Sequence, residues 1–128
     1  AQSKVHAVEG DARAMAALES AARNRQGLKP VTVEKRDLFR RPMMASELKT
    51  FDAVVFDPPR AGAEFQSKEL ARSTVRKIAA VSCNPQTLAR DLSILVSGGY
   101  RVVSVTPIDQ FLWSPHVEVV AALERPKK

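Results

Sequence analysis

The sequence "IAAVSCNPQTLARDLSILVSGG", residues 78–99, decides the fold class because it contains one strand and the helix that follows it. Its first six residues are apolar or small, as in a buried strand. Asn84 stands at an N-cap position, with Pro85 at the first helical position. A glycine pair ends the helix, whose predicted buried stripe is Leu88, Leu92, Leu95 and Val96.

The rest of the chain repeats this alternation. Strand patterns lie at residues 4–10, 31–37, 51–60, 100–108 and 117–123, and helical patterns lie at 11–27 and 67–77. The first helix would bury Ala14, Leu18 and Ala22. The uninterrupted apolar centre of 51–60 indicates burial on both faces. We therefore predict an α/β fold with a mostly parallel sheet and helices on both faces.

Composition narrows the class of protein. The 128 residues suit one domain, and 45% hydrophobic with 27% charged residues indicates a globular chain. It contains no long apolar stretch and no signal-peptide pattern, so we expect a cytoplasmic protein without a membrane partner. The single cysteine excludes an internal disulfide and a four-cysteine metal site, and we expect no metal. A net charge of +6 suits RNA, although a solvated cationic surface is the alternative.

Ligands of such sheets bind beyond the carboxyl ends of the strands, where this chain repeatedly places an acid or a thiol. Glu9 has the position of a carboxylate that accepts two ribose hydroxyls, or of a surface acid near a helix N-terminus. Asp37 could accept from an adenine amino group, but it could equally cap a turn. Asp57 follows a strand pattern directly and is held in place by the two prolines of "DPPR". The alternative is an ordinary turn, although a buried strand that runs straight into this sequence is rare for one.

Two further segments suggest chemistry. Cys83 precedes a helix N-terminus, where partial positive charge favours a thiolate nucleophile, although a lone cysteine is often a small core residue. In "DQFLWSPHVE", residues 109–118, His116 and Glu118 are candidate general bases beside aromatic rings that could stack on a base. The alternative is a loop anchored by Trp113, with Glu118 solvated on a strand.

Three ordered motifs resemble the RNA 5-methyluridine methyltransferase family, which uses S-adenosylmethionine. They are "DPPRAG" at 57–62, "AVSCNPQT" at 80–87 and "DQFLWSPHVE". The chain departs from the family pattern at Ala80, where tyrosine is usual, and at Leu112, where proline is usual. We expect altered packing near Cys83 and a looser loop from these changes.

The resemblance implies a role for each candidate residue. Cys83 would add to C6 of a uracil in rRNA or tRNA, and Glu118 would remove the C5 proton after methylation. The cofactor would contact Glu9, Asp37 and Asp57. The substrate would contact Arg60, Asn84 and His116. Arg60 also stands where an aromatic residue would indicate methylation of a base amino group, and so argues against that reaction.

The resemblance also implies that residues 1–128 are a C-terminal portion of a methyltransferase catalytic domain. The first strand and glycine-rich turn of the family should precede Glu9, but only eight residues do. We expect the sheet to pair the flanking strands directly, borrow a strand, or leave an edge covered by a homodimer. This chain alone is expected to be inactive. The competing hypothesis is a non-catalytic RNA-binding or regulatory remnant.

Overall fold

The computed structural model describes residues 5–10, 13–14, 16–17, 20, 31–108 and 118–126. These residues belong to two compact units, Ala1–Pro42 and Met43–Lys128, and each unit is described by itself. The expectation of one catalytic domain over residues 1–128 stays a prediction.

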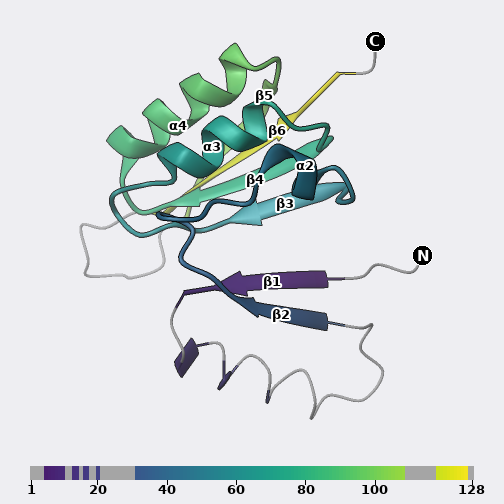
Figure 1. Cartoon of the computed structure of the whole chain (residues 1–128). Helices are drawn as coiled ribbons and strands as arrows, with labels where there is room; N and C mark the ends of the chain where they lie inside the picture. The colour runs from purple at the N-terminus through teal and green to yellow at the C-terminus, as the bar shows by residue number, and fades with distance from the viewer. Residues whose placement is uncertain are drawn as a thin grey trace, which may run out of the picture. The chain divides into compact units, whose positions relative to one another are not determined.

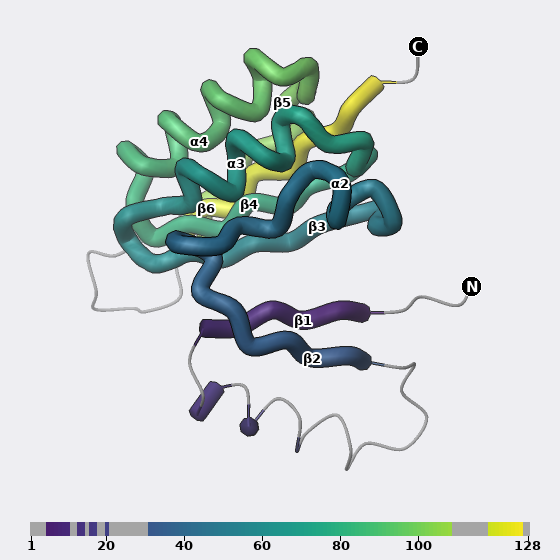
Figure 2. Tube along the Cα trace, viewed as in Figure 1, coloured from purple at the N-terminus to yellow at the C-terminus, as the bar shows by residue number. Residues whose placement is uncertain are grey.

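The first unit contains two parallel strands, β1 (Val5–Glu9) and β2 (Val31–Lys35), which lie side by side in Figure 2. Their register runs from Val5 opposite Val31 to Glu9 opposite Lys35. Parallel neighbours need a crossover between them, and the described residues 13–14, 16–17 and 20 are helical. This agrees with the predicted helix, but Ala14 of its expected buried face is exposed, and Leu18 and Ala22 lie outside the described residues.

The second unit contains a four-stranded sheet in the order β3 (Ala53–Phe56), β4 (Lys77–Ser82), β6 (Glu118–Glu124) and β5 (Arg101–Ile108). β3 and β4 are parallel, whereas β6 is antiparallel to both of its neighbours. The sheet is therefore mixed, and the prediction of a mostly parallel sheet was wrong. The reason is that the chain turns back after β5 and inserts β6 between β5 and β4.

β1 and β3 belong to separate sheets. Because β1 and β3 lie in different units, direct pairing of the strands that end at Glu9 and Asp57 stays a prediction, as do the other two expected arrangements. In the described residues β3 forms a ladder with β4 alone, which leaves its other edge open within the unit.

The helices of the second unit are α2 (Ala45–Leu48), α3 (Glu64–Ala71) and α4 (Pro85–Ser97), and Figure 1 shows all three on one face of the sheet. Side chains on this face are buried: Ile78, Ala80, Ala121 and Leu123 are at most 2% exposed. On the other face Val55 is 72% exposed. The predictions of helices on both faces and of a doubly buried strand at 51–60 are thus not met in the described part of this unit.

Local sequence explains where the helices begin and end. α4 has the predicted Asn84 cap, whose side chain accepts from the Gln86 backbone N–H, and Gly98 closes it. α3 begins before the predicted residue 67 and stops at Ala71, where Ser73 Oγ donates to the Leu70 carbonyl instead of continuing the helix. The short helix α2 was not predicted.

The α4 stripe was predicted correctly at Leu88 and Leu95, which are buried, but wrongly at Val96, which is exposed. Asp91 is buried in addition, with 1% of its surface exposed. A pattern of apolar residues does not show such a position, because the burial of an aspartate depends on partners elsewhere in the chain.

Candidate active site

The candidate catalytic residues Cys83 and Glu118 lie at the same edge of the four-stranded sheet, namely the edge formed by the carboxyl ends of β3 and β4. The antiparallel ladder between β4 and β6 ends with Ser82 opposite Val119. The next residue outward on the β4 side is Cys83, and the next on the β6 side is Glu118. Both are half-buried, and Cys83 is a free thiol. Two segments 35 residues apart in sequence numbering therefore bring a thiol and a carboxylate to one edge.

Asp57 belongs to the same edge because it directly follows β3, which is parallel to β4. Phe56, the last residue of β3, is opposite Ala80 of β4. Ala80, the departure from the family pattern, is fully buried and also pairs with Ala121. Asp57 itself is exposed. Three neighbouring strands thus present Asp57, Cys83 and Glu118 together.

Hydrogen bonds on either side of Cys83 hold its backbone in place. Ser82 Oγ accepts from the Asn84 N–H at 3.0 Å and donates to the Asn84 carbonyl at 3.0 Å. Asn84 Oδ1 accepts from the Gln86 N–H at 3.0 Å, which caps α4. Its Nδ2 donates to the Arg60 carbonyl at 3.0 Å. Asn84 therefore acts on the protein itself, and its contact with substrate stays a prediction.

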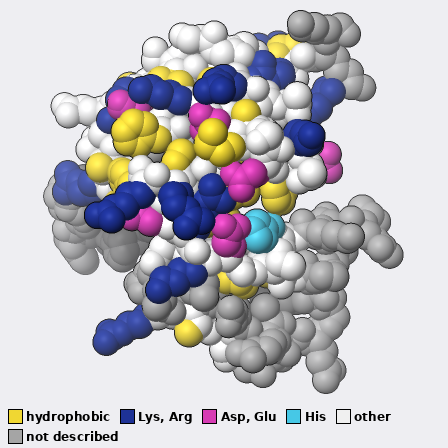
Figure 3. Space-filling model, viewed as in Figure 1, with side chains coloured by type: hydrophobic (Ala, Val, Ile, Leu, Met, Phe, Trp, Pro, Cys, Tyr) yellow, Lys and Arg dark blue, Asp and Glu magenta, His cyan; other side chains and the backbone are white. Residues whose placement is uncertain are grey.

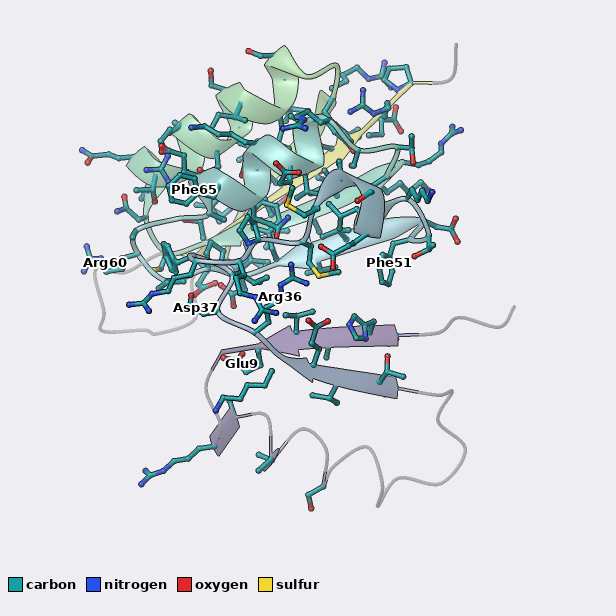
Figure 4. All side chains as sticks on the ribbon, viewed as in Figure 1. Glu9, Arg36, Asp37, Phe51, Arg60 and Phe65 are labelled. Carbon is teal, nitrogen blue, oxygen red and sulfur yellow. The ribbon has the colours of Figure 1, made fainter. Side chains whose placement is uncertain are left out.

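The loop after β3 is built on a tight turn. The Gly62 N–H donates to the Pro59 carbonyl at 2.8 Å, and Gly62 has φ +83°, a conformation that favours glycine. The Arg60 side chain is exposed and points outward in Figure 4. Its backbone carbonyl, by contrast, faces α4, where it accepts from both Asn84 and Thr87.

In the first unit, Glu9 ends β1 and Asp37 follows β2 by two residues, so the parallel register places both at the same end of their strands (Figure 4). Asp37 Oδ1 accepts from the Phe39 N–H at 3.0 Å, and Oδ2 lies 3.8 Å from Arg40 Nε. The turn role left open for Asp37 is thus present, and its cofactor role stays a prediction.

Sequence reasoning missed Thr87, Arg90 and Asp91, which join α4 to the loop after β3. Asp91 Oδ2 accepts from the Ala63 N–H at 2.7 Å, and Arg90 Nη2 donates to the Ala61 carbonyl at 2.9 Å. The available signal was spacing, since Asn84, Thr87 and Asp91 stand at i, i+3 and i+7 and so share one helical face.

Other predicted features lie outside the described residues, namely His116, Phe111, Leu112 and Trp113. Within the described part of the chain, no group of three His, Cys, Asp or Glu side chains could hold a metal ion. A helix long and apolar enough to cross a membrane is not found among the described residues either.

This α/β arrangement is similar to that of the fibrillarin pre-rRNA processing protein of Methanococcus jannaschii. The TM-score is 0.59 at 18% sequence identity, covering 96% of this chain and 56% of that protein. At this identity the similarity shows the fold alone.

Curated relatives share far more sequence. Over 95% of its length the chain is 76% identical to an uncharacterised RNA methyltransferase of Agrobacterium fabrum and 79% identical to one of Rhizobium meliloti. It is 45% identical over 61% of its length to the 23S rRNA (uracil(1939)-C(5))-methyltransferase RlmD of Hahella chejuensis. The chain spans 29% of the length of each of the first two relatives.

Residues 20–126 match the tRNA (uracil-5-)-methyltransferase family. Because this match covers most of the sequence, the chain belongs to that family, as its three motifs predicted.

Proposed function

We propose that the longer protein containing this chain transfers a methyl group to C5 of a uridine in rRNA or tRNA. The carrying observation is the ladder end that brings Cys83 and Glu118 to one edge of the sheet. Family membership supports the reaction class, and the name of the Hahella chejuensis relative supports rRNA as the substrate.

The reaction needs a nucleophile and a base at different times. The Cys83 thiolate attacks C6, forming an S–C6 bond, and the C5–C6 electron pair moves toward the C4 carbonyl to give an enolate. C5 then takes up the methyl group that S-adenosylmethionine would supply, with S-adenosylhomocysteine as the leaving group. The Glu118 carboxylate removes the C5 proton, the C5–C6 double bond reforms, and the thiolate leaves C6. This order explains why a thiol and a carboxylate occupy adjacent strands.

S-adenosylmethionine would supply the methyl group. Glu9 and Asp37 fit its nucleoside end, since they place carboxylate acceptors at the carboxyl ends of neighbouring parallel strands. The cofactor contact of Asp57, which the family resemblance implies, stays a prediction. We propose that residues 1–128 form part of a class I, Rossmann-like domain, a proposal supported by the 29% of the length of the first two curated relatives that the chain spans.

Surface chemistry supports an RNA partner. Figure 3 shows Lys and Arg side chains interspersed with hydrophobic and acidic ones on one face of the Met43–Lys128 unit. Phe65 is an exposed ring on α3, and Lys68 Nζ lies 5.6 Å from its centroid. An exposed aromatic beside cations suits stacked bases and phosphates. Arg60 and His116 would contact the target uridine, which must leave its stack to reach Cys83. A cytoplasmic location follows from such substrates.

The deciding experiment uses intact mass under denaturing conditions. Full-length enzyme is mixed with S-adenosylmethionine and transcribed 23S rRNA or tRNA carrying 5-fluorouridine. A fluorine at C5 cannot leave as a proton, so an adduct on the Cys83 peptide is expected, whereas Cys83→Ala should form none. Methyl transfer to the same transcript without any adduct would contradict the mechanism.

Glu118 has a separate signature. Glu118→Gln should accumulate the methylated adduct on ordinary uridine, because addition proceeds while proton removal is lost. Wild-type enzyme on the same RNA is the control. Equal, undetectable adduct levels in both, with unchanged turnover, would remove Glu118 from the base role.

A non-catalytic remnant is the alternative function. Full-length protein that binds RNA but neither S-adenosylmethionine nor 5-fluorouridine RNA covalently would favour it.

A further inference from the structure

We infer that one polar face of α4 positions the loop Asp57–Ala63 relative to Cys83, so that Thr87, Arg90 and Asp91 are positioning residues for the methyl transfer. The inference rests on the proposed function, because it gives these residues a task only if Cys83 and the loop act on one substrate.

The contacts form a continuous set along the loop. The Arg60 carbonyl accepts from Asn84 Nδ2 and Thr87 Oγ1, both at 3.0 Å. The Ala61 carbonyl accepts from Arg90 Nη2, and the Ala63 N–H donates to Asp91. Backbone groups of Arg60, Ala61 and Ala63 are thus bonded to side chains of α4 and of its N-cap.

The Asp91 carboxylate is the buried centre of this set. Its Oδ1 accepts from Arg90 Nε at 3.1 Å and from Arg90 Nη2 at 3.0 Å, while Oδ2 accepts from the loop. Its side chain is 2% exposed, against 39% for Arg90. Burying a polar side chain is costly unless it is hydrogen-bonded, and both Asp91 oxygens have partners. Arg90 and Asp91 therefore hold the loop together as a bonded pair.

Gly62 shows how closely the loop approaches the helix. A Cβ at this position would lie 2.6 Å from Arg90 Nη2, 2.9 Å from Asp91 Oδ2 and 2.9 Å from Thr87 Cβ. Side chains at three α4 positions thus occupy the space that any larger residue would need. Two features therefore favour glycine at this position of "DPPRAG": its positive φ in the turn and the close approach of α4 side chains.

These contacts affect the distance between Cys83 and the loop after β3. α4 begins one residue after Asn84, and Cys83 immediately precedes that cap. The loop carries Asp57 and Arg60, which are proposed to contact cofactor and substrate. Because the same helix fixes the backbone of the loop and follows directly from Cys83, it sets the separation between the nucleophile and those side chains. A displacement of about 1 Å at such a site can lower a rate by roughly 100-fold.

The test uses Thr87, whose hydroxyl lies 3.0 Å from the Arg60 carbonyl and 3.3 Å from the Asn84 carbonyl and can be removed with little change in volume. Thr87→Val in the full-length enzyme deletes the hydroxyl donor, and Thr87→Ser retains it. Ser93→Ala, at an exposed position on the same helix, is the control. The rate of Cys83 adduct formation is measured on 5-fluorouridine 23S rRNA, with saturating S-adenosylmethionine, beside the melting temperature and the RNA KM.

We expect Thr87→Val to lower the maximal adduct rate by about tenfold, with unchanged KM and melting temperature, and Thr87→Ser to restore most of the rate. A lowered melting temperature with an unchanged adduct rate would mean a structural role only and overturn the inference. Unchanged rate and melting temperature would overturn it also. If wild-type enzyme itself forms no adduct while methylating the RNA, it is the proposed function that fails.

Discussion

Glu34 on β2 shows how single side chains join the two strands of the first unit. Its Oε1 lies 3.0 Å from His6 Nε2 on β1, and its Oε2 accepts from Arg36 Nη1 at 3.3 Å. The hydrogen bond with His6 lowers the pKa of Glu34 below its ordinary value of 4.5, and Arg36 adds to this effect against partial burial. The charged carboxylate is therefore the form that the folded unit prefers.

We predict that Glu34 makes this chain less stable in acid. Because its folded-state pKa is lowered, its contribution to stability is present above pH 4.5 and is lost as the pH falls through the lower value. Urea unfolding of wild type and Glu34→Gln should differ most at pH values above 4.5 and converge as the pH falls below it. A difference that stays constant with pH would contradict the assignment.

At the residue scale, features that depend on neighbours in the sequence could be predicted, whereas features that depend on distant segments could not. The Asn84 cap and the position of Gly98 were predictable because both depend on neighbours within one helix. Buried Asp91 and exposed Val55 were not, because their surroundings come from the loop after β3 and from the open sheet face. Cys83 and Glu118 were chosen by their motifs, and their proximity follows from a ladder register that the sequence pattern did not show.

At the scale of elements, Arg125 links the end of β6 to the C-terminal ends of α3 and α4. It follows β6 by one position and donates to the Gly98 carbonyl at 2.8 Å and to the Ala71 carbonyl at 2.9 Å, at the C-terminal ends of α4 and α3. Its guanidinium also lies 4.2 Å from the Tyr100 ring centroid. A cation at two helix C-termini satisfies carbonyls that lack helical partners and favours both dipoles.

Removing this cation should loosen both helix ends. We predict that Arg125→Met lowers the free energy of unfolding by about 2 kcal/mol, because two charge-assisted hydrogen bonds are lost while most apolar contact is kept. Arg125→Lys should recover part of it. Urea denaturation gives the energies, and hydrogen exchange should show faster exchange in the last turns of α3 and α4. An effect confined to β6 would refute the link.

Element-level prediction succeeded where a segment carried its own periodicity and failed where pairing order mattered. Every strand and α4 were located from their patterns, but the antiparallel insertion of β6 was not, because alternation of strands and helices says nothing of direction after the last helix. The four-residue α2 is too short for a periodic signal.

At the scale of the whole molecule, the second unit leaves apolar side chains exposed on one face of its sheet and leaves one edge of β3 unpaired within the described part of the unit. Val55 is 72% exposed although it lies within an apolar strand. Ile108 at the end of β5 is 40% exposed. A homodimer that covers the open edge of β3 stays a prediction.

We predict that the proposed longer protein covers the Val55 face. Val55→Thr should change the unfolding free energy of this chain by less than about 0.5 kcal/mol, but should destabilise the full-length protein by about 1–2 kcal/mol. Urea titrations of both, with Ser93→Ala as the exposed control, provide the comparison. Equal small effects in both lengths would show that Val55 faces solvent in the longer protein too.

The position of β6 has a consequence for synthesis. β6 comes later in the chain than β4 and β5, yet it lies between them. While a ribosome makes this protein, β4 and β5 must therefore wait as separate strands until residues 118–124 emerge. Cys83 is translated well before Glu118, so the proposed base is absent from this edge until then. The order of translation thus delays assembly of the candidate catalytic pair until β6 can pair with β4 and β5.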